Sequence, residues 1–172
     1  MKVMFISDIH GSYYWANRAI EKYHEEKADK LIILGDILYH GPRNDLPKDY
    51  NCKKVIALLN PLKKDIIAVR GNCDSEVDTL VLDMPIQAPY TYVVAEGLKI
   101  VTTHGHYVET DEAKDKMAKA LKADIFISGH VHINVLEKRG NTVFLNPGSP
   151  SLSKREDNRA TVAVLELSLI HI

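Results

Sequence analysis

Short runs of β-branched and aliphatic residues alternate with helix-like patterns through the first half of the chain. Five runs have the composition of buried strands, at 2–7, 31–34, 66–69, 99–103 and 125–128. Between them, apolar residues recur at helical spacing in 14–26 and 51–59, and Pro61 ends the second of these segments. The stretch 37–49 contains glycine and prolines and predicts a loop.

From residue 90 onward the pattern changes. Two apolar segments flank a Glu-Gly turn, which predicts an antiparallel hairpin over 90–103. Residues 111–122 begin with acids and end with bases, as a helix dipole prefers. The last apolar segments, 133–138, 142–145 and 161–167, suggest an antiparallel second sheet. We therefore expect an α/β (α+β) fold in which two stacked mixed β-sheets are flanked by helices.

Composition is that of an ordinary globular protein. The 172 residues are 45% hydrophobic and 26% charged, with a net charge of −1, so one domain over 1–172 is expected. No basic tract favours general nucleic-acid binding, and no apolar run approaches a membrane span or a signal peptide. Cys52 and Cys73 make no disulfide framework, so a reduced, cytoplasmic protein is expected. Residues 168–172 are interpreted as a disordered or non-native end.

Metal-competent side chains follow the strand-like runs. The clusters are Asp8-Ile9-His10, Gly35-Asp36, Gly71-Asn72-Cys73-Asp74, His104 and Gly129-His130-Val131-His132. Ligands at the carboxyl ends of strands converge on one edge of a sheet. Two carboxylates, four histidines and one amide suit two divalent cations that share a carboxylate, the apparatus of metal-assisted phosphoester hydrolysis.

Each cluster alone has a simpler interpretation. Asp8 and Asp36 could cap the segments that follow them, and His10 could be a surface histidine. Asn72 could adopt a left-handed conformation in a tight turn, and a single histidine after a strand, such as His104, is more often structural. Five independent strand ends that all carry such groups make coincidence improbable, so the metal site is the strong inference.

The ordered set D-x-H, G-D, G-N-x-D, H and G-H-x-H resembles the calcineurin-like metallophosphoesterases, over nearly the whole chain. The short length, the 70–74 variant and the Asn-Pro-Gly-Ser segment at 146–149 are most similar to the YfcE-type phosphodiesterase branch. This resemblance implies the two-sheet sandwich of that family, in agreement with the pattern above.

The resemblance also implies a ligand set. The first metal would be bound by Asp8, His10, Asp36 and His132, and the second by Asp36, Asn72, His104 and His130, with Asp36 bridging. Two cations about 3.5–4 Å apart would activate a hydroxide for in-line attack. Oxygen and imidazole ligands suit Mn, Fe, Zn or Ni, and the resemblance favours Mn.

Cys73 departs from the family pattern, which commonly has histidine there. A thiol is a poorer general acid than an imidazolium near neutral pH. We interpret Cys73 as a residue that only fills the place of the histidine next to the site. The alternatives are a redox-sensitive thiol and a metal ligand. His106 could contact substrate or hydrogen-bond a ligand, and 146–149 is interpreted as a structural turn beside the site.

The sequence thus predicts a metal-dependent phosphodiesterase acting on a small phosphoester, with catalytic roles for Asp36, Asn72, Cys73 and His104. Two alternatives stay open. One is a phosphomonoesterase or protein phosphatase. The other is a catalytically silent interaction scaffold, as in the retromer subunit of the same fold. A homo-oligomer is also left open.

Overall fold

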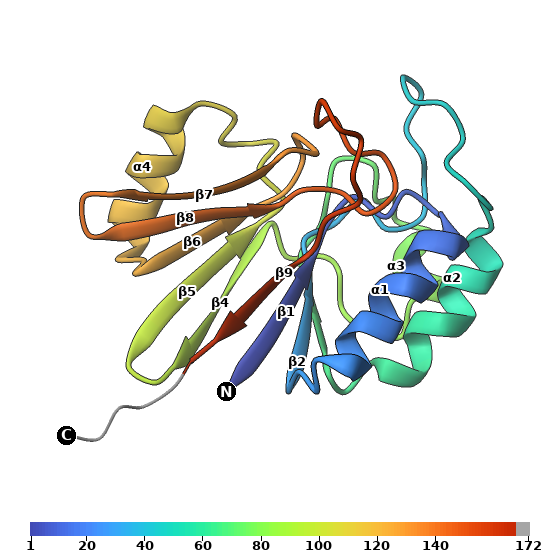
Figure 1. Cartoon of the computed structure of the whole chain (residues 1–172), viewed down its shortest axis with the longest axis horizontal. Coiled ribbons are helices and arrows are strands. Elements are labelled where there is room, and N and C mark those ends of the chain that lie inside the picture. The colour runs from blue at the N-terminus through green and yellow to red at the C-terminus, as the bar shows by residue number, and fades with distance from the viewer. Residues whose placement is uncertain (168–172) are drawn as a thin grey trace.

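Two stacked β-sheets form the centre of the molecule, as a computed structural model that describes residues 1–167 shows (Figure 1). The first sheet has four strands in the order β3-β2-β1-β9, and the second has five in the order β4-β5-β6-β8-β7. Helices cover the outer faces of both sheets. The predicted fold of two mixed sheets flanked by helices is confirmed.

The sheets differ in how they are built. In the first, β1 (Lys2–Ile6), β2 (Lys30–Ile33) and β3 (Ile66–Ala68) are parallel, and β9 (Ala163–Glu166) pairs antiparallel with β1. In the second, β5 (Leu98–Thr103), β6 (Ile125–Ser128) and β8 (Thr142–Pro147) are parallel, between antiparallel edge strands β4 (Tyr90–Ala95) and β7 (Asn134–Arg139). The parallel strands of each sheet direct their carboxyl ends to one end of the molecule (Figure 1).

Helices α1 (Tyr13–Glu25) and α2 (Cys52–Leu59) pack on the first sheet, and α4 (Asp111–Leu121) packs on the second. A 3₁₀ turn, η1 (Asn60–Leu62), follows α2, and the short α3 (Asp78–Val81) lies between β3 and β4. The side chains of Ser12, Asn51 and Thr110 cap α1, α2 and α4. Among the helices of residues 1–167, none is long and apolar enough to cross a membrane.

Strand alternation divides the core. On β1, Val3 and Phe5 point between the sheets, whereas Met4 and Ile6 pack toward the helices. All four side chains are fully buried. Because both faces of β1 are covered, its sequence reads as a continuous apolar run, which is why the sequence pattern located it well.

One part of the topology corrects the sequence prediction. Segment 161–167 was expected in the second sheet, but β9 joins the first sheet beside β1. The buried edge of β1 needs partners for its backbone N–H and C=O groups, and β9 supplies them. Leu165 also packs into the layer between the sheets. In the second sheet, β4 pairs antiparallel with β5, and β7 pairs antiparallel with β8. The pairing of β8 with β6 is parallel, so this sheet is mixed. Residues 168–172 lie outside the described part of the chain.

The sheets approach closely where β1 and β6 end. A Cβ atom added to Gly129 would overlap Ser7 Oγ and lie 3.0 Å from Asp8 Oδ2. We expect Gly129→Ala to lower the free energy of unfolding by about 1–3 kcal/mol, since the crowded groups cannot all move aside. Urea denaturation measures this. The double variant Ser7→Gly/Gly129→Ala should be more stable than the sum of the single changes predicts, and strict additivity would contradict the clash.

Candidate metal centre

All seven predicted ligand residues come together at the carboxyl ends of β1, β2, β3, β5 and β6, where the two sheets meet. Five of them are buried, namely Asp8, His10, Asp36, His104 and His132. His130 is partly exposed and Asn72 is exposed. The predicted convergence of strand ends is therefore observed, with a buried part and an open part.

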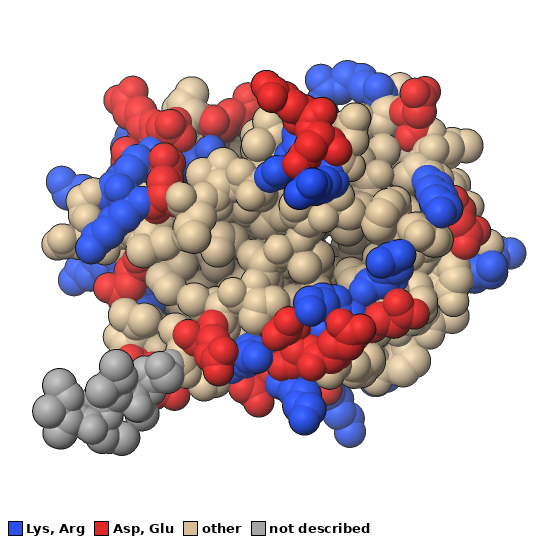
Figure 2. All heavy atoms as spheres, in the orientation of Figure 1, with Lys and Arg blue, Asp and Glu red and all other residues tan. Residues whose placement is uncertain are grey.

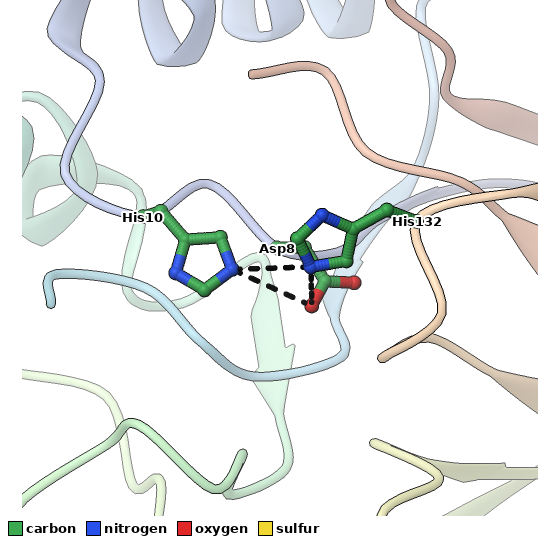
Figure 3. A group of neighbouring side chains, drawn as sticks. All are labelled: Asp8, His10 and His132. Atoms are coloured by element: carbon green, nitrogen blue, oxygen red, sulfur yellow. Dashed lines mark hydrogen bonds and ion pairs between the residues drawn. The ribbon is translucent and has the colours of Figure 1, made fainter. Parts of the chain in front are cut away.

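The first group consists of Asp8, His10 and His132, whose ligand atoms all lie within 4.8 Å of one another (Figure 3). Asp8 Oδ1 lies 3.2 Å from His132 Nε2 and 3.8 Å from His10 Nε2. The two imidazole Nε2 atoms are 3.3 Å apart. In Figure 3 both rings turn this nitrogen toward the carboxylate.

The second group is centred on Asp36 and His104. Asp36 Oδ2 lies 3.4 Å from His104 Nε2 and 3.8 Å from His10 Nε2, so one oxygen atom lies within reach of both groups. Asn72 Oδ1 is 2.9 Å from His104 Nε2, and His130 Nδ1 is 3.2 Å from the same nitrogen. This is the arrangement expected if Asp36 joins two neighbouring sites.

Backbone carbonyls fix the orientation of three imidazole rings. The Nδ1 atoms of His10, His104 and His132 lie 2.6–2.7 Å from the carbonyl oxygens of Tyr39, Leu34 and Leu152. A carbonyl only accepts, so each Nδ1 carries a proton, and a neutral ring would keep the Nε2 lone pair for the centre. His130 differs, because its Nε2 faces Glu109 Oε1 at 3.4 Å and its Nδ1 faces the site.

The backbone of this region is unusual. Five of the seven residues have φ between 51° and 72°, in the left-handed region that side chains other than glycine rarely adopt: Asp8, His10, Asp36, His130 and His132. Such outliers cluster at functional sites. Alternation along a strand would also aim residues two apart to the same side, but Asp8 and His10 face the same centre through a turn after β1.

The sequence does not predict the hydrogen bonds by which Asp74 and Ser149 hold the loops of the site. Asp74 is buried and accepts backbone N–H bonds from Asp36, Ile37 and Gly71 at 2.7–2.9 Å, which ties the loops after β2 and β3 together. Ser149 donates its hydroxyl to the Asp8 carbonyl at 2.8 Å. The segment 146–149 is thus structural, as expected, and it holds the loop that presents Asp8.

Electrostatics couple the carboxylates to the imidazoles. Burial alone raises the pKa of Asp36, but the hydrogen bond and charge of His104 outweigh it and hold that pKa well below its usual range. Burial lowers the pKa of His104, yet the Asp36 hydrogen bond and the charges of Asp8 and Asp36 raise it to about 9. For His10 burial prevails and lowers the pKa, so this ring favours its neutral form.

The residues fit divalent cations. Asp8 Oδ1 is completely buried and has no hydrogen-bond donor within the described chain, although three histidine Nε2 atoms lie 3.2–4.0 Å away. If His10 and His132 are both neutral, their Nε2 lone pairs face each other across 3.3 Å. A cation between these atoms satisfies the carboxylate oxygen and both lone pairs at once.

Cys73 lies beside the centre, where its Sγ forms a third close group with His10 and Asp36. Burial, reinforced by Asp36, raises the pKa of this thiol to about 12. Its backbone N–H donates to Asp36 Oδ1 at 2.8 Å. A cleft of about 920 Å³ opens over this region, and His106 lines a neighbouring cavity next to Asn72.

Comparisons with known proteins agree with this geometry. The sequence profile of the calcineurin-like phosphoesterase superfamily domain matches residues 1–169. Phosphodiesterase YfcE of Escherichia coli K12 is 41% identical over 172 residues, which cover 100% of this chain and 91% of that protein. A solved structure of YfcE, described as a phosphoesterase, matches with a TM-score of 0.86 and 43% identity over 96% of this chain and 88% of its own.

A structure described as a novel archaeal phosphodiesterase matches with a TM-score of 0.72 and 26% identity, over 96% of this chain and 93% of its own. These similarities confirm the family resemblance drawn from the ordered motifs. Because the family profile covers residues 1–169 and a 41% identical relative aligns with the whole of this chain, the chain belongs to the calcineurin-like phosphoesterase superfamily.

Proposed function

We propose that this protein is a metal-dependent phosphodiesterase with a dinuclear centre. The observation that carries the proposal is the buried pair Asp8 and Asp36, surrounded by imidazole nitrogens and lacking a lysine or arginine partner within residues 1–167. Two divalent cations bound here would supply Lewis-acid stabilisation of phosphoryl oxygens and a hydroxide near neutral pH. The name of the YfcE relative and the description of the archaeal structure support a diester as the substrate.

In this proposal Asp8, His10 and His132 hold the first cation, and Asn72, His104 and His130 hold the second. Asp36 bridges, which agrees with its Oδ2 lying 3.4 Å from His104 and 3.8 Å from His10. The carbonyls that orient the rings keep each ligand atom in place before a cation arrives. Asn72 is exposed at the open side and also meets the substrate.

The alternatives lead to different expectations. A silent scaffold has no need for a buried, unpaired Asp8 oxygen, and this atom argues against that alternative. A phosphomonoester brings two negative charges into the site and would gain most from a cationic donor at position 73, beside Asp36, which Cys73 does not provide. We further propose Mn as the preferred metal, a cytoplasmic location consistent with two free cysteines, and a single domain.

Replacement of the proposed bridge tests the centre. Asp36→Asn removes a negative charge shared by both cations, so it should weaken both sites together, whereas His104→Ala should deplete mainly the second. Elemental analysis and calorimetric titration with Mn measure this. The wild-type protein should bind two cations, or one tightly and one weakly. Less than one metal per chain at saturation, or equal and mild effects of the two changes, would refute the assignment.

Cys73 is tested by two substitutions. Cys73→Ser should leave metal content intact and change turnover only modestly, because the sulfur fills space beside Asp36. Cys73→His should change the rate or the preference between monoester and diester, since it introduces an imidazole where the family commonly has one. If Cys73→Ser loses metal, the thiol is a ligand and the interpretation as a neighbour is wrong.

The leaving group provides the last test of this function. Without an imidazole at position 73, protonation of the departing oxygen is weak, so turnover should depend steeply on the acidity of the leaving phenol. Bis-aryl phosphate diesters should react faster than the matching aryl monoester. A series of aryl esters with graded phenol pKa, assayed with saturating Mn, measures both effects. A flat series or a clear monoester preference would favour the phosphomonoesterase.

A further inference from the structure

Two basic side chains line the cleft above the candidate metal centre. Arg43 lies in the loop between β2 and α2, and Lys154 lies in the loop between β8 and β9. Both loops rise at the end of the molecule where the parallel strands finish, the former in blue-cyan and the latter in orange-red in Figure 1. Both side chains share the cleft lining with His10, His132 and Asp36.

Each loop is tied to the metal centre by its backbone. The Tyr39 carbonyl, four residues before Arg43, accepts from His10 Nδ1 at 2.7 Å. The Lys154 N–H donates to the His132 carbonyl at 3.1 Å, and the Leu152 carbonyl accepts from His132 Nδ1 at 2.6 Å. The same segments therefore orient the first pair of histidines and carry the two cationic side chains. Their positions relative to the centre are built into the fold.

Arg43 is unusual among the arginines of the chain. The other five each have an anionic, hydrogen-bonding or aromatic partner: Arg18, Arg70, Arg139, Arg155 and Arg159. Over residues 1–167, Arg43 has no ion pair and no side-chain hydrogen bond, and the Lys154 ammonium has none either.

The acidic groups of the same cleft are already engaged. Asp74 accepts three backbone N–H groups, Glu109 faces His130, and Asp36 belongs to the candidate metal centre. Two cationic side chains that line one cavity and make no ion pair with residues 1–167 favour an anion in that cavity. Guanidinium offers a planar fork and ammonium a point charge, and both are used to bind phosphoryl oxygens.

We propose that Arg43 and Lys154 form an anion-binding pair that holds phosphoryl oxygens of the substrate. The proposal rests on the proposed function, because it names the part of the substrate that these residues contact. The phosphoryl group has two sources: the phosphate that is cleaved, or a second phosphate on one of the two ester groups. The chemistry of recognition is the same for both, and substrates can separate them.

The test compares Arg43→Gln and Lys154→Ala with matched controls outside the cleft lining, Arg18→Gln on α1 and Lys53→Ala on α2. Inorganic phosphate is the probe, and its Kd for the Mn-loaded protein is measured by calorimetry. Each cleft variant should weaken phosphate binding by about 10-fold, the usual value of a charge-assisted hydrogen bond, with metal content unchanged. The controls should stay within about 2-fold of wild type.

Kinetics then separate the two sources of phosphate. A bis-aryl phosphate diester is compared with the same diester carrying a phosphate group on one ring. A KM raised for both substrates assigns the pair to the cleaved phosphate, and a KM raised only for the second substrate assigns it to the additional phosphate.

Unchanged phosphate affinity and unchanged KM for both substrates would overturn the anion-binding pair, and so would a loss of binding that tracks loss of metal. If the wild-type protein binds phosphate but cleaves no diester, the proposed function is refuted. The phosphate Kd of the Arg43 and Lys154 variants then still decides whether these residues bind an anion.

Discussion

The burial of two carboxylates without a basic side chain beside them is the constraint on which this structure depends. Asp8 is 0% and Asp36 2% exposed, and over residues 1–167 their charged neighbours are imidazoles. In proteins generally, moving an ionised carboxylate out of water costs several kcal/mol of free energy, even after the surrounding protein has relaxed. The compensation has to come from positive charge at the Nε2 atoms, either as protons or as metal cations. The Asp36 hydrogen bond and the charges of Asp8 and Asp36 raise the pKa of His104 to about 9, which favours a proton on this ring beside the two carboxylates.

Keeping these groups together requires backbone conformations that the local sequence does not favour. Left-handed conformations at residues other than glycine cost on the order of 1–3 kcal/mol each when strained. The compensation lies in contacts between distant segments. Asp74 joins two loops of the first sheet, and Ser149 reaches the Asp8 carbonyl from the other end of the chain. Gly129, which follows β6 of the second sheet, approaches Ser7 and Asp8 after β1 so closely that a methyl group there has no space.

Much of this could be predicted from the sequence, because buried strands and ordered motifs are local signals. The five strand-like runs and the ligand residues that follow them lie where the pattern placed them. The sheet to which β9 belongs was not predictable, since its alternating pattern fits either sheet and only the unpaired edge of β1 decides. The roles of Asp74 and Ser149 depend on contacts across 37–38 and 141 positions. No spacing rule for single motifs detects such contacts, and the same holds for Arg43 and Lys154, which line one cleft only in the folded chain.

The two halves of the centre are not equivalent, and the difference follows from what orients each ring. His10 and His132 are buried and each is held by a backbone carbonyl, so the first half is the more deeply buried part of the centre. In the second half Asn72 is exposed, and the His130 ring faces the carboxylate of Glu109, a side chain that is itself 67% exposed. An exposed carboxylate holds a ring less firmly than a backbone carbonyl does, because its own rotamers are free. A cation bound on this side would exchange more readily. The same openness would give a substrate access to a cation bound there, while the more buried half would keep Asp36 in place between the two groups.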